Sequence, residues 1–138
     1  MSNVFKGKQE KTGLEYFDNC YDILAEMRRV LFNTKYFPKR YLYTDVVPIM
    51  KLYHRMRNNI VFANTIYPYD EDELKRKKDY IQIAIESCEA IIVAFQDAIM
   101  TMETLKPSNV LALGEMLIEE AKLLRGLKKN VKVLKNRK

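Results

Sequence analysis

The sequence predicts an all-α protein, built as an antiparallel up-down-up-down bundle of four helices. Three observations support this class. The 138 residues are enough for one domain with its own core. Nearly half of them (48%) are apolar, whereas only four glycines and four prolines are available for the turns that a sandwich or barrel needs. Apolar residues recur every three or four positions in four segments that are joined by short connections.

The first helix is predicted over residues 13–35, behind a polar segment, residues 1–12, that is expected to be frayed and flexible. Apolar residues step along one face of this helix and charged residues occupy the other. The apolar set is Leu14, Phe17, Tyr21, Leu24, Met27 and Leu31, and the polar set is Asp18, Asp22, Glu26 and Arg29. Pro38 ends the helix, because the residue before a proline is disfavoured in the α region.

The second helix is predicted over residues 45–67. Thr44 is expected to cap its N-terminus, Asp45 suits the positive end of the helix dipole, and Pro48 falls in the first turn. Its apolar face is wide, with a stripe and a second edge formed by Ile49, Tyr53, Met56, Ile60, Ala63, Tyr67, Val46, Met50 and Val61. A face this wide indicates contacts on two sides, either within the bundle or with another subunit.

The third helix is predicted to begin after Asp70 and to extend to about Leu105. Asp70 with Glu73 three residues later is an aspartate version of the capping box, which satisfies the free amides of a first turn. The most regular apolar pattern in the chain follows, through Leu74, Ile81, Ile85, Cys88, Ile92, Phe95, Ile99 and Met102. At this length the helix is about 50 Å long and requires a long partner helix.

The fourth helix is predicted to start with Ser108 or Asn109 as its cap. Its apolar face carries Leu113, Met116, Leu117, Ala121, Leu124 and Leu127, and its outer face is expected to carry Glu115, Glu119, Glu120 and Lys122. The bundle therefore occupies residues 13–130, and a basic tail, residues 131–138, follows it.

Several kinds of chemistry have no support in the sequence. His54 is the single histidine, so the paired Glu-x-x-His motifs of di-metal bundles, zinc spacings and a Cys–His nucleophile are not predicted, and neither is a Gly-rich phosphate loop. Cys20 and Cys88 fall in apolar helical patterns and are expected to be buried, reduced thiols. No membrane span and no signal peptide are predicted. We therefore expect a cytoplasmic protein that is not an enzyme, has no cofactor and binds no membrane.

Basic residues are clustered, and the clusters indicate a polyanionic partner. The net charge is +6, and residues 125–138 hold seven basic residues and no acid. Residues 28–57 hold eight basic residues and one acid, Asp45. The tail alone is equally consistent with a solvated segment that keeps the protein soluble. Residues 75–78 form another basic run, but the preceding acids at 70–73 balance it, which is typical of a solvated helix start.

Tyr36, Tyr41 and Tyr43 interleave with the cations of the connection between the first two helices. Nucleic-acid bases stack on such rings while cations meet phosphates. Alternatively, the tyrosines close the end of the bundle as amphipathic side chains. The sequence leaves both interpretations open.

Four stretches, in their order and spacing, resemble a known family. They are FPKRYLYT, RNNIVFANTIYP, DELKRKKDYIQIAIESCEAI and GEMLIEEAKLLRGLKKN, and with the residues between them the resemblance covers about residues 14–130. The chain resembles the four-helix-bundle family of ribosomal-RNA intervening-sequence proteins, and most closely the accessory variability determinants of diversity-generating retroelements. The resemblance implies a non-enzymatic bundle that assembles as a homopentameric ring. It also implies binding to nucleic acid, RNA or DNA, and to a reverse transcriptase during mutagenic copying of template RNA into cDNA.

The candidate nucleic-acid-binding residues follow from this resemblance and from the clustered charge. The resemblance favours Lys39, Arg40, Arg55, Arg57, Arg125, Lys128 and Lys129, and the charge cluster adds Arg28, Arg29 and Lys51. Asn64 is expected to form hydrogen bonds at a helix end. The leading hypothesis is a retroelement accessory protein. The alternative is a structural or protein-interaction bundle of the intervening-sequence family with no nucleic-acid role, and its basic tail would serve solubility.

Overall fold

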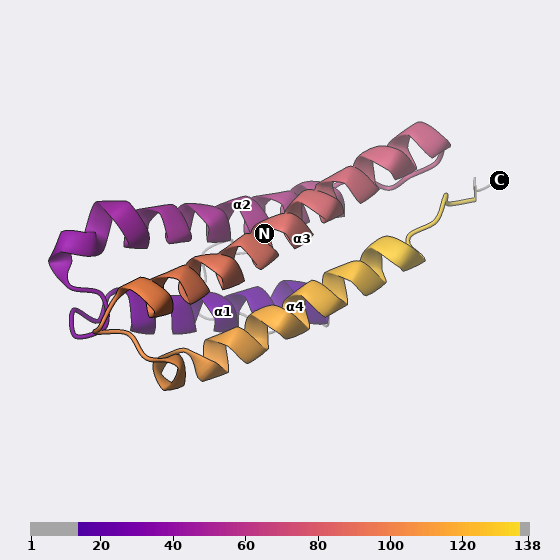
Figure 1. Cartoon of the computed structure of the whole chain (residues 1–138). Helices are drawn as coiled ribbons and strands as arrows, with labels where there is room; N and C mark the ends of the chain where they lie inside the picture. The colour runs from indigo at the N-terminus through magenta and orange to yellow at the C-terminus, as the bar shows by residue number, and fades with distance from the viewer. Residues whose placement is uncertain (1–13, 136–138) are drawn as a thin grey trace, which may run out of the picture.

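The computed structural model describes residues 14–135 and is all-helical, with no strand in that range. Four α-helices span Glu15–Leu31 (α1), Val47–Asn64 (α2), Glu71–Thr101 (α3) and Leu111–Asn130 (α4). Consecutive helices run in opposite directions (Figure 1), so the predicted four-helix class is confirmed. The predicted flexible segment, residues 1–12, lies outside the described residues.

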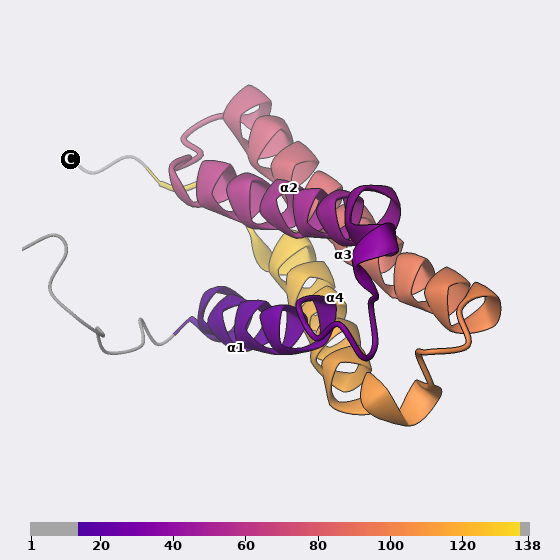
Figure 2. The ribbon, with the colours of Figure 1, turned by 90° about the vertical axis from the view of Figure 1, so that its left-hand side faces the viewer.

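The four helices surround one hydrophobic core. The long helix α3 packs against both α2 and α4, and α1 packs against α4 and, less extensively, against α2 (Figure 2). Each helix contributes fully buried side chains: Ile23, Met27, Met56, Ile60, Ile81, Ile91, Leu113, Leu117 and Leu124 are among the largest. Burying one such side chain stabilises the fold by about 1.5–3 kcal/mol. Cys20 and Cys88 are buried free thiols, as predicted.

Asp70 caps the start of α3, as the sequence predicts, but the second hydrogen bond of the capping box uses the amide one residue earlier than expected. The amide of Glu73 donates to Oδ1 of Asp70 at 2.8 Å. The carboxylate of Glu73 accepts from the amide of Tyr69 at 2.9 Å rather than from that of Asp70. The helix ends at Thr101, because Met102 is extended with φ −118° and ψ 126°. Met102 and Leu105 are nevertheless buried. The two residues therefore reach the core from the segment that follows the helix, and the helix does not need to continue to Leu105.

The predicted N-cap at Thr44 is wrong. A 3₁₀ turn (Lys39–Tyr41) leads into a π-helical turn (Leu42–Val46), and α2 follows without a break. Because the residues before Val47 are already helical, its first amides need no side-chain cap, and none is present. The Thr44 hydroxyl donates to Asp45 Oδ2 at 2.7 Å instead.

The cap predicted for the fourth helix is also absent. Oδ1 of Asn109 accepts from the amide of Lys106 at 2.9 Å and so closes the 3₁₀ turn Pro107–Asn109, and α4 begins two residues later without a side-chain cap. α1 and α2 end at Leu31 and Asn64, before the predicted residues 35 and 67. Among the described residues, no helix combines the length and the apolar character that crossing a membrane requires.

Candidate nucleic-acid interface

Five candidate residues form an exposed basic surface, here called the corner surface: Arg28, Lys39, Arg40, Lys51 and Arg55. It begins at the connection between α1 and α2, which two contacts fix in place. The buried ring of Phe37 meets Phe95 edge-on at 6.2 Å between centroids. The Thr104 hydroxyl donates to the carbonyl of Tyr36 at 2.9 Å. This anchored connection holds Lys39 and Arg40 at the surface.

The corner surface continues along α2. Lys51 and Arg55 are four residues apart, so they lie on one side of the helix, and both are exposed. Arg28 lies in the last turn of α1 and is also exposed. Within residues 14–135 none of the five cations forms a salt bridge. Their charges are therefore available to a ligand.

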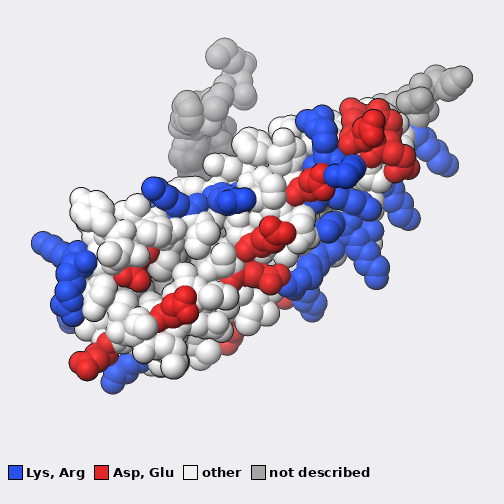
Figure 3. Space-filling view, turned by 45° about the horizontal axis from the view of Figure 1, so that its top comes forward, with Lys and Arg blue, Asp and Glu red and all other residues white. Residues whose placement is uncertain are grey.

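Aromatic rings accompany these cations. The guanidinium of Arg40 lies 4.8 Å from the centroid of the Tyr41 ring, and the side chain of Tyr43 is 81% exposed. Tyr43 therefore does not close the end of the bundle, whereas Tyr36 and Tyr41 are half-buried and pack against the core. In Figure 3, basic side chains lie at the end of the molecule that carries this connection, and a larger group lies at the opposite end.

Arg29 differs from the residues of the corner surface because an acid neutralises it. Its Nε and Nη2 atoms donate to the two carboxylate oxygens of Glu26 at 3.0 and 2.9 Å. These bonds lower the pKa of Glu26, so the pair stays ionised at neutral pH. Arg29 thus adds little net charge to the surface.

Arg57, predicted to face a nucleic acid, packs between α1 and α2 instead. Its guanidinium lies 3.9 Å from the ring centroid of Phe17 and 5.4 Å from that of Tyr21. Its Nη1 atom is buried and has no hydrogen-bond partner among the described residues. The position explains the burial, since Arg57 follows Tyr53 by four residues and precedes Ile60 by three on the core side of α2.

Changing Arg57 to Ala is expected to lower the free energy of unfolding by about 1–2 kcal/mol, because a partly desolvated cation–π contact and a packed stem are lost. Arg55→Ala is the matched control: it removes an exposed arginine from the same helix, and we expect a change below about 0.5 kcal/mol. Urea unfolding measures both values. Equal losses in the two variants would contradict the packing role of Arg57.

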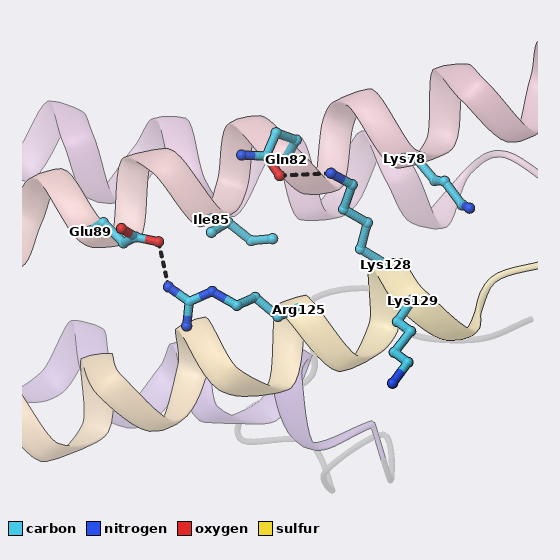
Figure 4. A pocket seen from close by; sticks show the side chains of 7 residues that line it. All are labelled: Lys78, Gln82, Ile85, Glu89, Arg125, Lys128 and Lys129. Carbon is cyan, nitrogen blue, oxygen red and sulfur yellow. Dashed lines mark hydrogen bonds and ion pairs between the residues drawn. The ribbon is translucent and has the colours of Figure 1, made fainter.

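The remaining candidates, Arg125, Lys128 and Lys129, lie in the last turns of α4, and this helix ends on the side of the bundle away from the connection between α1 and α2 (Figure 1). Figure 4 shows their side chains from close by. They line a groove between α3 and α4 together with Lys78. Arg125 is ion-paired with Glu89, and Nζ of Lys128 donates to Oε1 of Gln82 at 2.9 Å. The ten candidates therefore do not form one surface.

The sequence does not single out Lys77 and Lys78, because the charge-balanced run at residues 75–78 predicts a solvated helix start. Nζ of Lys77 donates to the carbonyls of Ala63 at 2.7 Å and Ile66 at 3.0 Å and so satisfies the C-terminus of α2, and burial lowers the pKa of this lysine. Lys78 faces the basic end of α4. The position of Lys78 could have been predicted from the antiparallel order of the helices, because this order places the start of the third helix beside the end of the fourth.

A buried polar cluster centres on Glu120, which was expected to face solvent. Its side chain is 0% exposed, and its carboxylate accepts from Nδ2 of Asn19 at 3.3 Å and from Sγ of Cys20 at 3.4 Å. The Tyr53 hydroxyl donates to the carbonyl of Cys20 at 3.0 Å. Burial raises the pKa of Glu120 to about 7. The hydrogen bonds from Asn19 and Cys20 and the positive charge of Arg57 oppose this shift.

The thiols of Cys20 and Cys88, which lie near this carboxylate, are not activated. Burial raises the pKa of Cys20, and it raises that of Cys88 to about 12, so both thiols stay protonated and are poor nucleophiles. The part of the chain that the structure describes holds no group of His, Cys, Asp and Glu side chains that could bind a metal. Oδ1 of Asn64 accepts from the Tyr16 hydroxyl at 2.9 Å, which confirms its predicted hydrogen-bonding role at a helix end.

Comparison with protein-family models, with curated proteins and with solved structures finds no match to this chain. The resemblance to retroelement accessory proteins therefore remains a prediction from the sequence. What the structure adds is the position of each basic and aromatic side chain.

Proposed function

We propose that this chain is a non-enzymatic, cytoplasmic nucleic-acid-binding bundle that assists the reverse transcriptase of a diversity-generating retroelement. The observation that carries the proposal is the corner surface, where five exposed cations without salt bridges in residues 14–135 accompany the exposed ring of Tyr43. The sequence resemblance supplies the retroelement, the polymerase partner and assembly as a homopentameric ring.

Binding on the corner surface is expected to depend on phosphates. Lysine and arginine side chains bind phosphate oxygens and release condensed counterions, whereas an exposed tyrosine stacks on any base. We therefore infer low sequence preference and strong salt dependence.

The accessory role follows from simultaneous binding. A bundle that holds the template RNA and the polymerase raises the local concentration of one near the other without performing chemistry itself. Ring assembly multiplies the number of corner surfaces that one RNA can contact. The rigid anchoring of the connection through Phe37 and Thr104 supports this role, because its cations need little ordering on binding.

The test is a titration of a fluorescent single-stranded RNA of about 20 nucleotides at several salt concentrations. Five phosphate contacts give a slope of log K against log salt of about −3.5, so the affinity falls about a hundredfold between 50 and 200 mM salt. An affinity that does not change with salt would overturn the proposal.

The second candidate function is a protein-interaction bundle without a nucleic-acid role. It is favoured by the exposed apolar and aromatic side chains around the end of α2, among them Val61, Phe62, Tyr67 and Tyr69. Sedimentation of the protein with and without the same RNA at low salt separates the two functions. A species whose sedimentation never shifts with RNA supports this second function.

A further inference from the structure

A continuous groove runs along the seam between α3 and α4, on surface that the corner does not use. It consists of three adjoining hollows of about 360, 280 and 170 Å³. The first and second share Glu89 and Arg125, and the second and third share Ile92 and Ile118. Along α3 the groove extends from Lys78 to Ile99, which is about 32 Å at 1.5 Å per residue.

The chemistry of the groove changes along its length. Lys78, Lys128 and Lys129 surround one end, together with the Arg125–Glu89 ion pair (Figure 4). In the other two hollows most of the lining side chains are apolar. The exceptions are Glu89 and Arg125, which the second hollow shares with the first, and Gln96 in the third. On the rim, Val93 is 52% and Ile118 62% exposed. A long apolar surface with this much exposure is typical of an interaction site.

Gly114 makes the apolar end accessible to a partner. It lies inside α4, where glycine costs about 1 kcal/mol relative to alanine, and it lines the groove. A Cβ atom added there would meet nothing within 4 Å. The space above the backbone of α4 is therefore open, and a partner can approach it closely.

We propose that this groove binds an amphipathic helix of a protein partner, with apolar residues along one face and acidic residues at one end. A length of about 32 Å accommodates a helix of roughly 20 residues, which is the helix-in-groove mode of recognition. The apolar face of that helix covers the two apolar hollows, and its acids meet the lysines at the basic end. The proposal does not depend on nucleic-acid binding by the corner surface.

Other occupants match the groove less well. A nucleic acid would lay its phosphates over two apolar hollows and would meet the carboxylate of Glu89 at the basic end. Residues 1–13 of the chain carry three lysines and one glutamate, so their charge repels the basic end. In a second copy, the acids of residues 70–73 are followed at once by the basic run at 75–78, so that helix start does not supply an acidic and apolar face.

The experiment uses synthetic peptides of 20 residues with the intact chain. Two acidic peptides carry a leucine stripe at helical spacing and glutamates on the same face, at the N-terminal end in one and at the C-terminal end in the other. Matching peptides carry lysines in place of the glutamates, and shuffled peptides keep the composition without the helical spacing. Fluorescence anisotropy measures affinity and circular dichroism measures the helicity of the bound peptide.

The groove predicts a definite pattern of affinities. One acidic peptide binds with a gain in helicity, and its lysine counterpart binds at least tenfold more weakly. Ile118→Glu lowers the affinity for the acidic peptide at least tenfold. Lys128→Glu combined with Lys129→Glu reverses the preference, so that the lysine peptide becomes the tighter ligand. The matched controls, Val61→Glu and the pair Lys51→Glu with Arg55→Glu, leave both affinities unchanged.

Several outcomes would overturn the proposal. They are no binding of either acidic peptide at millimolar concentration, equal binding of the acidic and lysine peptides, equal binding of the shuffled peptides, and no effect of Ile118→Glu. A lower mass of Ile118→Glu by light scattering assigns the groove to a second copy. Loss of RNA affinity in the Lys128 and Lys129 double variant, with RNA affinity retained in the Lys51 and Arg55 pair, assigns it to nucleic acid.

Discussion

Changing Lys39, Arg40, Lys51 and Arg55 together to glutamate is expected to reduce affinity for single-stranded RNA at least a hundredfold at 100 mM salt. Four phosphate contacts are lost and four repulsive charges take their place. A hundredfold loss corresponds to about 2.7 kcal/mol, so each position needs to contribute only about 0.7 kcal/mol. The remaining RNA affinity of this variant should also depend much less on salt than that of the parent chain. Arg57 stays unchanged in this variant, because its replacement disturbs the packing between α1 and α2.

The control for this variant alters the net charge equally at other places. Glutamate replaces four exposed cations outside the corner surface: Arg76, Lys122, Lys132 and Lys135. If binding depends on the corner surface, this control loses far less affinity than the corner variant at the same salt concentration. Similar losses in both variants would show that overall charge, rather than the corner surface, determines RNA binding. Circular dichroism verifies that both variants are folded.

Raising the pH from 5 to 8 is expected to destabilise the protein by about 2–3 kcal/mol through Glu120 alone. The pKa of this carboxyl is about 7 in the folded chain, whereas an unperturbed glutamate has a pKa near 4.3–4.5. Between these two values the folded state holds a proton that the unfolded state has released, so stability falls as the pH rises through this window. The physical cause is burial of the carboxylate, which its hydrogen bonds from Asn19 and Cys20 offset only in part.

Glu120→Gln tests this effect, because its neutral amide resembles the protonated acid. The variant is expected to lose most of the pH dependence and to be more stable than the parent chain above pH 7. Glu119→Gln is the matched control, since Glu119 is the exposed neighbour on the same helix. It should keep most of the pH dependence, because the charge of Glu119 makes only a small contribution to the raised pKa of Glu120. Urea unfolding at pH 5, 6, 7 and 8 gives the comparison, and parallel curves for the two variants would contradict the assignment.

The helical class and the cap of α3 could be predicted because both depend on local sequence. Apolar periodicity is a local signal, and the contact between Asp70 and the amide of Glu73 spans three residues. The predicted cap at Thr44 failed for a local reason too: the preceding turn was already helical, so no free amide remained for a cap. Single helix ends are therefore less predictable than the helices themselves.

The spacing of apolar residues in α4 predicts that Glu120 is buried, whereas its charge predicts that it faces solvent. Glu120 follows Leu117 by three residues and precedes Leu124 by four, which are positions of the core stripe of α4. Asp18, which was expected on the polar face of α1, is buried as well. A prediction that places every charged residue in solvent ignores the position of that residue in the apolar repeat. Such a prediction is wrong where a neighbouring helix supplies hydrogen-bond donors, as α1 does to Glu120 through Asn19.

The division of the candidate cations could not be read from the sequence, because it depends on contacts between distant segments. Lys78 and Lys128 are 50 positions apart in the chain and line the same groove. The orientation of Arg57 depends on rings that α1 supplies. Charge clustering along the chain therefore identified basic residues correctly but not the surfaces to which they belong.

The even number of antiparallel helices has a practical consequence. α1 begins, and α4 ends, on the side of the bundle away from the connection that carries Lys39 and Arg40 (Figure 1). An attachment made at the start of α1 or at the end of α4 therefore lies away from those two cations. A chain immobilised through either of these helix ends presents Lys39 and Arg40 on the side away from the attachment.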